Sequence, residues 1–134
     1  MTRFVLDAGA VLHVTGSAGF DVAPGHELLA PTLVRSQTLS LLHEAVARGE
    51  LDRDAALAQH ERIGGLRMRL LGDAVLRRVA WNLADELGWP DTYAAEYLAL
   101  TRLQADAFVT MDEALARAAA TVVPVAPVDA LRRP

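Results

Sequence analysis

The chain has 134 residues, which fits one domain over residues 1–134, and its 13 basic and 17 acidic residues give a formal net charge of -4. This balance excludes a broadly basic surface that binds nucleic acid by charge alone, so any such contact must be local. The absence of cysteine excludes a disulfide framework, a thiolate metal site and a cysteine nucleophile. No apolar run approaches the roughly 20 residues needed to cross a bilayer, so we expect a soluble, cytoplasmic protein with no membrane contact.

Short apolar runs and helical spacing alternate along the sequence. In chain order they predict a strand at residues 3–6, a helix to 14, a loop at 16–25, a helix from 31 to 49, a helix at 51–62, a strand at 66–71, a helix at 73–87, a helix from 90 to 103, a strand at 106–110, a helix to 120 and a strand at 122–125. Asp73 is expected to cap the helix that follows it, with Val75, Leu76 and Trp81 facing the core.

Strands separated by helices require crossover connections, which predict a parallel sheet between two helical layers. The expected fold is therefore a three-layer α/β/α sandwich. In such folds, ligands bind beyond the carboxyl ends of the strands. Asp7 and Asp112 both follow predicted strands, so we expect them at that edge of the sheet.

Two carboxylates brought together from separate strand ends repel each other, and a hard cation between them would relieve the repulsion. Mg²⁺ or Mn²⁺ suits such oxygen ligands, and it can activate water against a phosphodiester. The alternative is that Asp7 and Asp112 only cap the helices that follow them. The residues alone leave both hypotheses open.

Four segments in order, FVLDAGAVL, APTLVRSQTLSLL, DTYAAEYLAL and AFVTMDEAL, resemble the PIN domain, specifically the toxin of VapBC-type toxin–antitoxin modules. The resemblance spans nearly the whole chain. It implies a parallel sheet sandwiched by helices and Mg²⁺- or Mn²⁺-dependent cleavage of RNA by a cluster of acids. It also implies that Asp7 is the first family acid, Asp112 the last, and Thr110 the hydroxyl residue before it.

Two positions depart from the family pattern. Gln37 stands where the family has glutamate, and Ala94 stands where it has aspartate. Gln37 can orient a metal-bound water through its amide, but it brings no charge. Ala94 admits two explanations, natural loss of the acid or deliberate replacement of it, and the sequence does not separate them.

Two neighbouring acids could replace the carboxylate missing at position 94. Glu96 lies about 200° round a helix axis from that position and faces away. Asp91 is only about 60° off, so it is the better substitute and a further candidate metal ligand. Its alternative role is to cap the helix after Pro90.

The remaining candidates are basic or hydroxyl residues. The arginines Arg62, Arg67, Arg69, Arg77 and Arg78 could grip an RNA backbone, or could form a solvated face paired with Asp73 and Asp85. Four histidines, His13, His26, His43 and His60, lack the spacing of a helical zinc motif. Ser17 and Ser36 lack the context of a nucleophile elbow.

These observations predict a VapC-like ribonuclease with a divalent ion held by Asp7 and Asp112, completed by Gln37 and Asp91. Because two acids are missing, we expect weak or abolished cleavage. The resemblance also implies a small VapB-type antitoxin as partner, and a homodimer. The alternative is a catalytically inactive PIN-like module that binds RNA or a protein.

Overall fold

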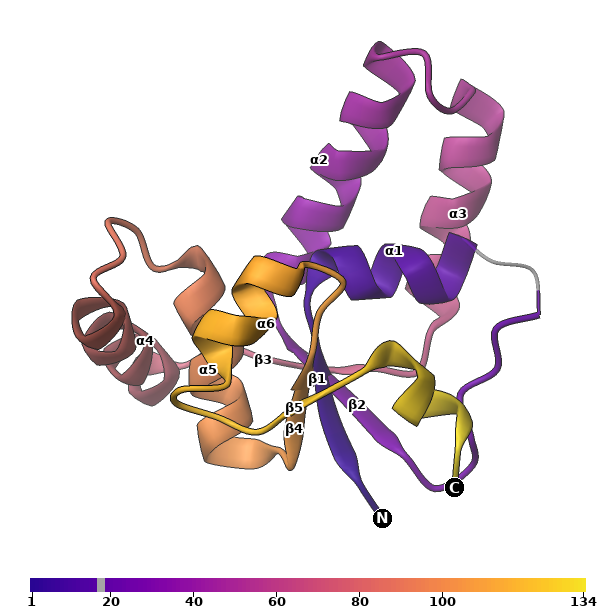
Figure 1. Ribbon diagram of the computed structural model, residues 1–134. Coiled ribbons are helices and arrows are strands. Elements are labelled where there is room, and N and C mark those ends of the chain that lie inside the picture. The colour runs from indigo at the N-terminus through magenta and orange to yellow at the C-terminus, as the bar shows by residue number, and fades with distance from the viewer. Residues whose placement is uncertain (17–18) are drawn as a thin grey trace.

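A computed structural model describes residues 1–16 and 19–134 (Figure 1). The elements are β1 (Arg3–Leu6), α1 (Ala8–Gly16), β2 (Glu27–Pro31), α2 (Leu33–Ala47), α3 (Arg53–Gly65), β3 (Arg69–Leu71), α4 (Ala74–Leu87), α5 (Tyr93–Gln104), β4 (Ala107–Val109), α6 (Glu113–Ala119), β5 (Val125–Ala126) and the 3₁₀ helix η1 (Val128–Arg132). Ser17, considered above as a nucleophile, lies outside the described residues.

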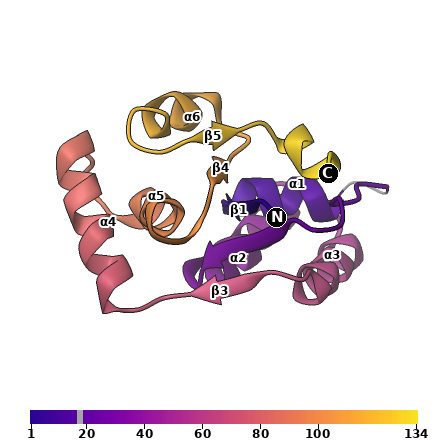
Figure 2. The same cartoon turned by 90° about the horizontal axis from the view of Figure 1, so that it is seen from below.

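The strands form one sheet in the order β3-β2-β1-β4-β5, and every neighbouring pair is parallel. Helices α1 and α3 lie on one side of this sheet, and α4 and α5 lie on the other (Figure 2). Val5 in the central strand is level with Leu29 on one side and with Phe108 on the other. The predicted three-layer α/β/α sandwich with a parallel sheet is therefore confirmed.

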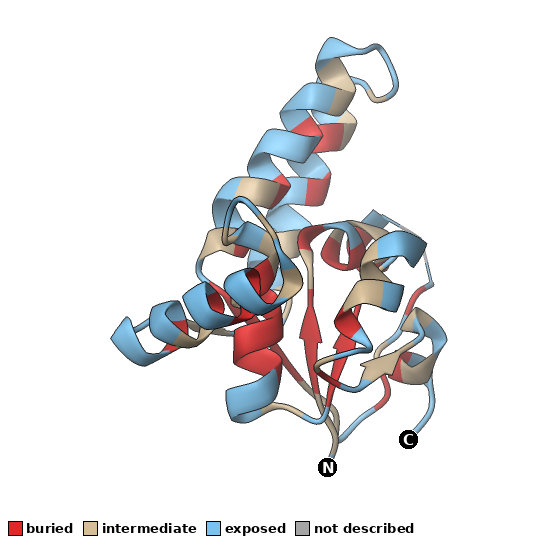
Figure 3. Cartoon of the chain, turned by 60° about the vertical axis from the view of Figure 1, so that its left-hand side comes forward, coloured by how far each residue is buried: buried red, intermediate tan, exposed pale blue. Residues whose placement is uncertain are grey.

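The core lies on both faces of the sheet, against α5 on one side and α1 on the other. Phe108, Leu6 and Leu29 from the strands are fully buried, as are Leu98 and Ala95 from α5. Figure 3 shows the buried residues concentrated in the strands and in the helix packed on them. Burying one such leucine contributes roughly 1.5–3 kcal/mol, so α5 is held firmly against the sheet.

Helices α2 and α3 pack on each other as a hairpin that extends beyond the carboxyl ends of the strands (Figure 1). α2 follows β2 with only Thr32 between them, so its first turns stand over the carboxyl edge of the sheet. This arrangement brings Gln37 above the ends of β1 and β4.

Aspartates begin several of the helices. Asp52, Asp73 and Asp112 each accept a hydrogen bond from the backbone N–H three residues later, at 2.7, 2.8 and 3.0 Å. Such a cap satisfies one of the free N–H groups of the first helical turn. The predicted cap at Asp73 is confirmed.

Strand β2 was missed by the sequence prediction, which began a helix at Pro31. Its sequence, Glu-Leu-Leu-Ala-Pro, has neither β-branched residues nor polar alternation. A central parallel strand buried on both faces needs no alternation, because both faces meet apolar partners. Hydrogen bonding to β1 and β3 on either side makes this segment a strand.

Two predictions on α4 were also wrong. Trp81 and Val75, expected in the core, are 65% and 59% exposed. Leu76, Ala80 and Leu83 form the buried face of the helix instead. Ala80 is small enough to let α4 approach α5 closely, and that choice of face turns Trp81 outward.

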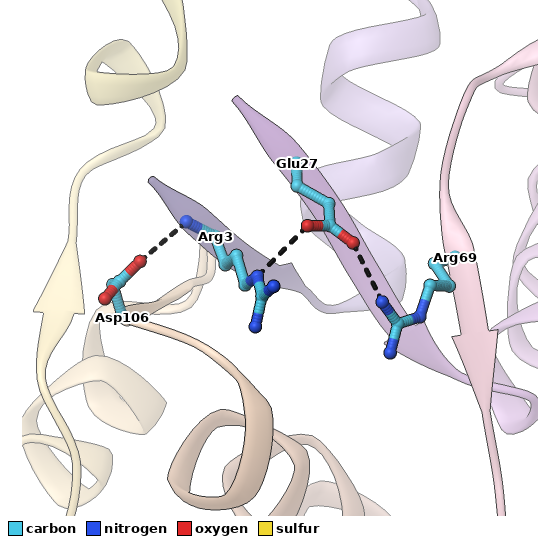
Figure 4. Close-up of polar contacts among 4 residues, drawn as sticks. All are labelled: Arg3, Glu27, Arg69 and Asp106. Carbon is cyan, nitrogen blue, oxygen red and sulfur yellow. Dashed lines mark hydrogen bonds and ion pairs between the residues drawn. The ribbon is translucent and has the colours of Figure 1, made fainter. Parts of the chain in front are cut away.

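At the amino ends of the strands, charged side chains are paired (Figure 4). Glu27 accepts hydrogen bonds from Arg3 at 3.0 Å and from Arg69 at 3.1 Å, which links three adjacent strands. The backbone N–H of Arg3 donates to Asp106 at 2.7 Å, which ties β1 to the chain entering β4. These contacts fix the register of the strands at this edge.

Within residues 1–16 and 19–134, every helix is too short or too polar to span a membrane.

Candidate active site

The order of the strands places the site. The chain moves from β1 to β2 and β3 on one side, and then crosses back to β4 and β5 on the other. The direction reverses between β1 and β4, which is where open α/β sheets bind ligands beyond their carboxyl ends. Asp7 follows β1 and Thr110 follows β4, and the N–H of Asp7 donates to the carbonyl of Val109 at 3.3 Å.

Thr110 joins the two predicted acids. Its hydroxyl donates to Oδ2 of Asp7 at 2.5 Å and accepts from the backbone N–H of Asp112 at 3.1 Å. The other carboxylate oxygen of Asp7 accepts from the N–H of Ala10 at 2.9 Å. Asp7 is thus held from two sides, and Asp112 is held as the cap of α6.

Asp7 also has an altered acidity. Burial raises the pKa of Asp7 above its usual value, the hydrogen bonds from Thr110 and Ala10 lower it, and the nearby charge of Asp112 raises it again. Among the described residues, no arginine or histidine forms an ion pair with Asp7 or Asp112. The repulsion expected from the sequence is therefore present, with no basic side chain to relieve it.

Asp7 borders an open groove of about 480 Å³. Its lining includes Asp7, Gln37, Glu44, Asp91, Ala94 and Tyr97. The structure thus brings Asp7, Gln37 and the pair Asp91 and Ala94 together from three separate segments. Asp112 does not line the groove and acts on it through Asp7.

Glu44 was not predicted as a site residue. It lies seven residues after Gln37 on α2, which is about two helical turns, and both side chains therefore lie on one face of the helix. Helical periodicity from Gln37 was the signal that could have found it. Glu44 is exposed.

Gln37 is already engaged. Its Oε1 accepts a hydrogen bond from the hydroxyl of Tyr97 at 2.5 Å. Tyr97 is 2% exposed, and burial together with the charges of Asp7 and Glu96 raises its pKa. The phenol therefore stays protonated, and one lone pair of the Gln37 amide oxygen is engaged by it.

Ala94 is half-buried in the first turn of α5 and offers the groove a methyl group only. Asp91, the predicted substitute, also lines the groove, and it accepts from the N–H of Tyr93 at a long 3.4 Å. Both roles considered for Asp91 thus remain compatible with its position. Glu96 does not line the groove, as expected from its position on the helix; burial raises its pKa and the charge of Arg77 lowers it.

The donors of the groove fit a divalent cation only weakly. Among the described residues, no group of three acidic or histidine side chains is placed to hold a metal ion. Asp7 and Asp112 supply unneutralised charge, and Mg²⁺ is often bound through one or two carboxylates with waters completing the shell. Weak binding of Mg²⁺ or Mn²⁺ is the most that this donor set supports.

The predicted arginines do not gather at the groove. Arg62 donates to the backbone carbonyl of Thr15, and Arg69 pairs with Glu27 at the amino edge. Arg67, Arg77 and Arg78 are exposed, and Arg77 lies near Glu96.

The histidines also lie apart from the groove. His26 contacts the carbonyl of Arg133 and the ring of Phe4. His43 and His60 line an apolar pocket between α2 and α3.

Comparison with known proteins addresses the fold. No family model matches the sequence, and no curated protein matches it. The crystal structure of PAE2754 from Pyrobaculum aerophilum is similar, with a TM-score of 0.77 and 20% sequence identity over 97% of this chain and 92% of that chain. At that identity, the similarity establishes a shared fold over nearly the whole length of both chains.

Proposed function

We propose that this chain is a PIN-type endoribonuclease that uses Mg²⁺ or Mn²⁺, with an acidic site weakened at positions 37 and 94. The observation that supports it best is the meeting of Asp7 with Thr110 and Asp112 at the switch point of the sheet, beside an open groove. An open groove of this kind suits an extended RNA strand better than a small ligand that must be enclosed.

In this proposal, Asp7 and Asp112 hold the cation, and Asp91 contributes from the rim of the groove. A bound Mg²⁺ or Mn²⁺ would supply an activated water and stabilise the charge that develops on the phosphate. The chain's own part is positioning: Thr110 and the N–H of Ala10 fix the carboxylate of Asp7, so no reorganisation is needed when the ion binds.

Weak or absent cleavage follows from the same contacts. Gln37 brings no charge and its oxygen already accepts from Tyr97, and Ala94 contributes no ligand. The cation would then be held chiefly by two acids and water, which lowers both its affinity and its positional precision.

Partners are proposed from the resemblance described above. They are a VapB-type antitoxin bound in the groove and a second copy of this chain, in the cytoplasm. The acids of the groove suit a basic segment of the antitoxin, because Asp7, Glu44 and Asp91 lack basic partners among the described residues.

A second candidate is a catalytically inactive PIN-like module that binds RNA or a protein. The specific observation favouring it is the absence of a three-acid group among the described residues. The two candidates differ in whether the acids still bind a cation.

The test is Mn²⁺-dependent cleavage of a structured RNA pool by this chain and by its Ala94→Asp variant, with Asp7→Ala as the blank. We expect Ala94→Asp to raise cleavage by roughly 10- to 100-fold, because it restores a carboxylate in the groove. A rise in melting temperature on adding Mn²⁺ is the accompanying binding measurement. No cleavage by either protein and no thermal shift would contradict the nuclease and favour the inactive module.

A further inference from the structure

The hydroxyl of Tyr97 has few possible partners. Tyr97 is 2% exposed, and a buried phenol proton left without an acceptor costs roughly 1–3 kcal/mol. Its hydrogen-bond partner is Oε1 of Gln37, at 2.5 Å. Asp7, whose charge raises the pKa of the phenol, uses its two oxygens to accept from Ala10 and Thr110.

This contact fixes the orientation of the Gln37 amide. If the amide were turned over, an NH₂ group would face the phenol, and the phenol proton would lose its acceptor. With the oxygen on Tyr97, the Nε2 group keeps its two N–H donors. Within the described part of the chain, Nε2 makes no hydrogen bond, and Gln37 lines the groove half-buried.

We infer that Gln37 is a substrate-positioning residue whose Nε2 donates to a non-bridging phosphate oxygen of RNA, an inference that rests on the proposed function. A group that presents only N–H donors attracts an anionic oxygen and repels a cation. Gln37 therefore does not replace the missing acid as a metal ligand; it changes that corner of the groove from cation-binding to phosphate-binding.

The groove is acidic, so a neutral amide instead of a carboxylate at position 37 affects how closely RNA can approach. Asp7, Glu44 and Asp91 all repel a phosphate, and a fourth carboxylate at position 37 would add to the repulsion. A neutral donor there lets the RNA backbone approach between the acids. The inference predicts RNA binding without any divalent ion, since the contact is made by the amide.

The experiment measures the affinity of a fluorescein-labelled single-stranded RNA by anisotropy in EDTA, which prevents metal-dependent cleavage. We expect Gln37→Ala to weaken binding roughly 10- to 100-fold, as expected for one lost hydrogen bond to a charged group. Gln37→Glu is expected to weaken it more, because it replaces the donors with a negative charge. Tyr97→Phe is expected to weaken it less than Gln37→Ala, because the amide remains but is no longer oriented.

Gln104→Glu is the matched control. It makes the same chemical change at an exposed residue that lines a pocket at the amino edge. It is expected to leave RNA affinity within twofold of that of the unchanged chain. A methylphosphonate strand, which lacks the anionic oxygen, should abolish the difference between Gln37 and Gln37→Ala.

The outcomes separate the inference from the function. If the unchanged chain binds RNA and Gln37→Glu binds it equally well, the inference is overturned and the nuclease proposal stands. If the unchanged chain binds no RNA in EDTA yet Ala94→Asp cleaves RNA with Mn²⁺, the inference about Gln37 is overturned and the nuclease proposal stands. If RNA is neither bound nor cleaved by any variant, both fail. Melting temperatures of the variants identify any loss of affinity caused by unfolding.

Discussion

The two ends of the same sheet differ in whether their charged side chains are paired. At the amino edge, Glu27 lies between Arg3 and Arg69, so that each charge has a partner of opposite sign (Figure 4). At the carboxyl edge, Asp7 lies near Asp112 without a basic partner among the described residues. Paired charges hold the strands in register, whereas unpaired like charges cost stability and leave a site able to bind a ligand.

The largest effect is expected from Thr110→Val. Valine is nearly the same size as threonine but lacks the hydroxyl. Asp7 loses a donor and the N–H of Asp112 loses an acceptor, so we expect a loss of roughly 1–3 kcal/mol in the free energy of unfolding. Urea unfolding measures it. Thr110→Ser keeps the hydroxyl and should recover most of the loss; equal losses in both variants would show that the methyl group matters and the bridge does not.

At the amino edge, Glu27→Gln tests the paired charges. The change removes the carboxylate and leaves Arg3 and Arg69 beside each other, and both arginines are partly exposed. We expect a loss of about 1 kcal/mol, since solvent-exposed pairs contribute little individually. Urea unfolding at low and at high salt measures this change. The loss in the free energy of unfolding should be smaller at high salt. RNA cleavage by the Ala94→Asp chain should not change, and a change there would mean that the two edges are coupled.

Asp7→Asn is expected to alter the pH dependence of stability. The pKa of Asp7 is higher in the folded chain than its usual 3.8, so its ionised form is disfavoured by folding. Its contribution to stability is complete below the unfolded pKa and is lost as pH rises through the folded pKa. At pH 7 the variant therefore avoids the cost of ionising Asp7, but it leaves Thr110 or Ala10 without an acceptor, because an amide has one oxygen only.

Melting temperatures measured from pH 7 downwards give that comparison. The melting temperature of the variant minus that of the unchanged chain should fall as the pH falls towards 4, because protonation then neutralises Asp7 in the unchanged chain as well. A difference that grows at low pH would contradict the raised pKa. Asp7→Asn should also remove any thermal shift with Mn²⁺.

The smallest effect is expected at Trp81, far from both edges. Because this side chain is 65% exposed, Trp81→Ser should change the free energy of unfolding by no more than about 0.5 kcal/mol. Trp89→Ser, at a partly buried tryptophan packed against the core, should cost more. Equal costs would show that Trp81 is covered in solution, and sedimentation measurements would identify a second copy as the cover.

Features set by consecutive residues could be predicted from the sequence. Strands β1 and β4 are apolar runs that end before an acid, and their parallel pairing put Asp7 and Asp112 at one edge. β2 was missed because its Leu-Leu-Ala core has no strand propensity of its own. Trp81 was misplaced because two faces of α4 carry apolar residues, and packing on α5 decided between them.

The least predictable feature was the bond between Tyr97 and Gln37. The two residues are 60 positions apart, and nothing local in either segment indicates the partner. Gln37 was expected to orient a metal-bound water through its amide. The contact leaves the Nε2 group of Gln37 as the donor available for such a role, because Oε1 accepts from the phenol.

The pairing of β1 with β4 also bears on synthesis. Phe4 is level with Ala107 and Leu6 with Val109. About a hundred residues must therefore be synthesised after β1 before its neighbour β4 exists. A nascent chain that ends before β4 can carry Asp7 and Gln37, but it lacks Thr110 and Asp112. Any activity of this edge would therefore begin only after Thr110 and Asp112 have left the ribosome and β4 has paired with β1.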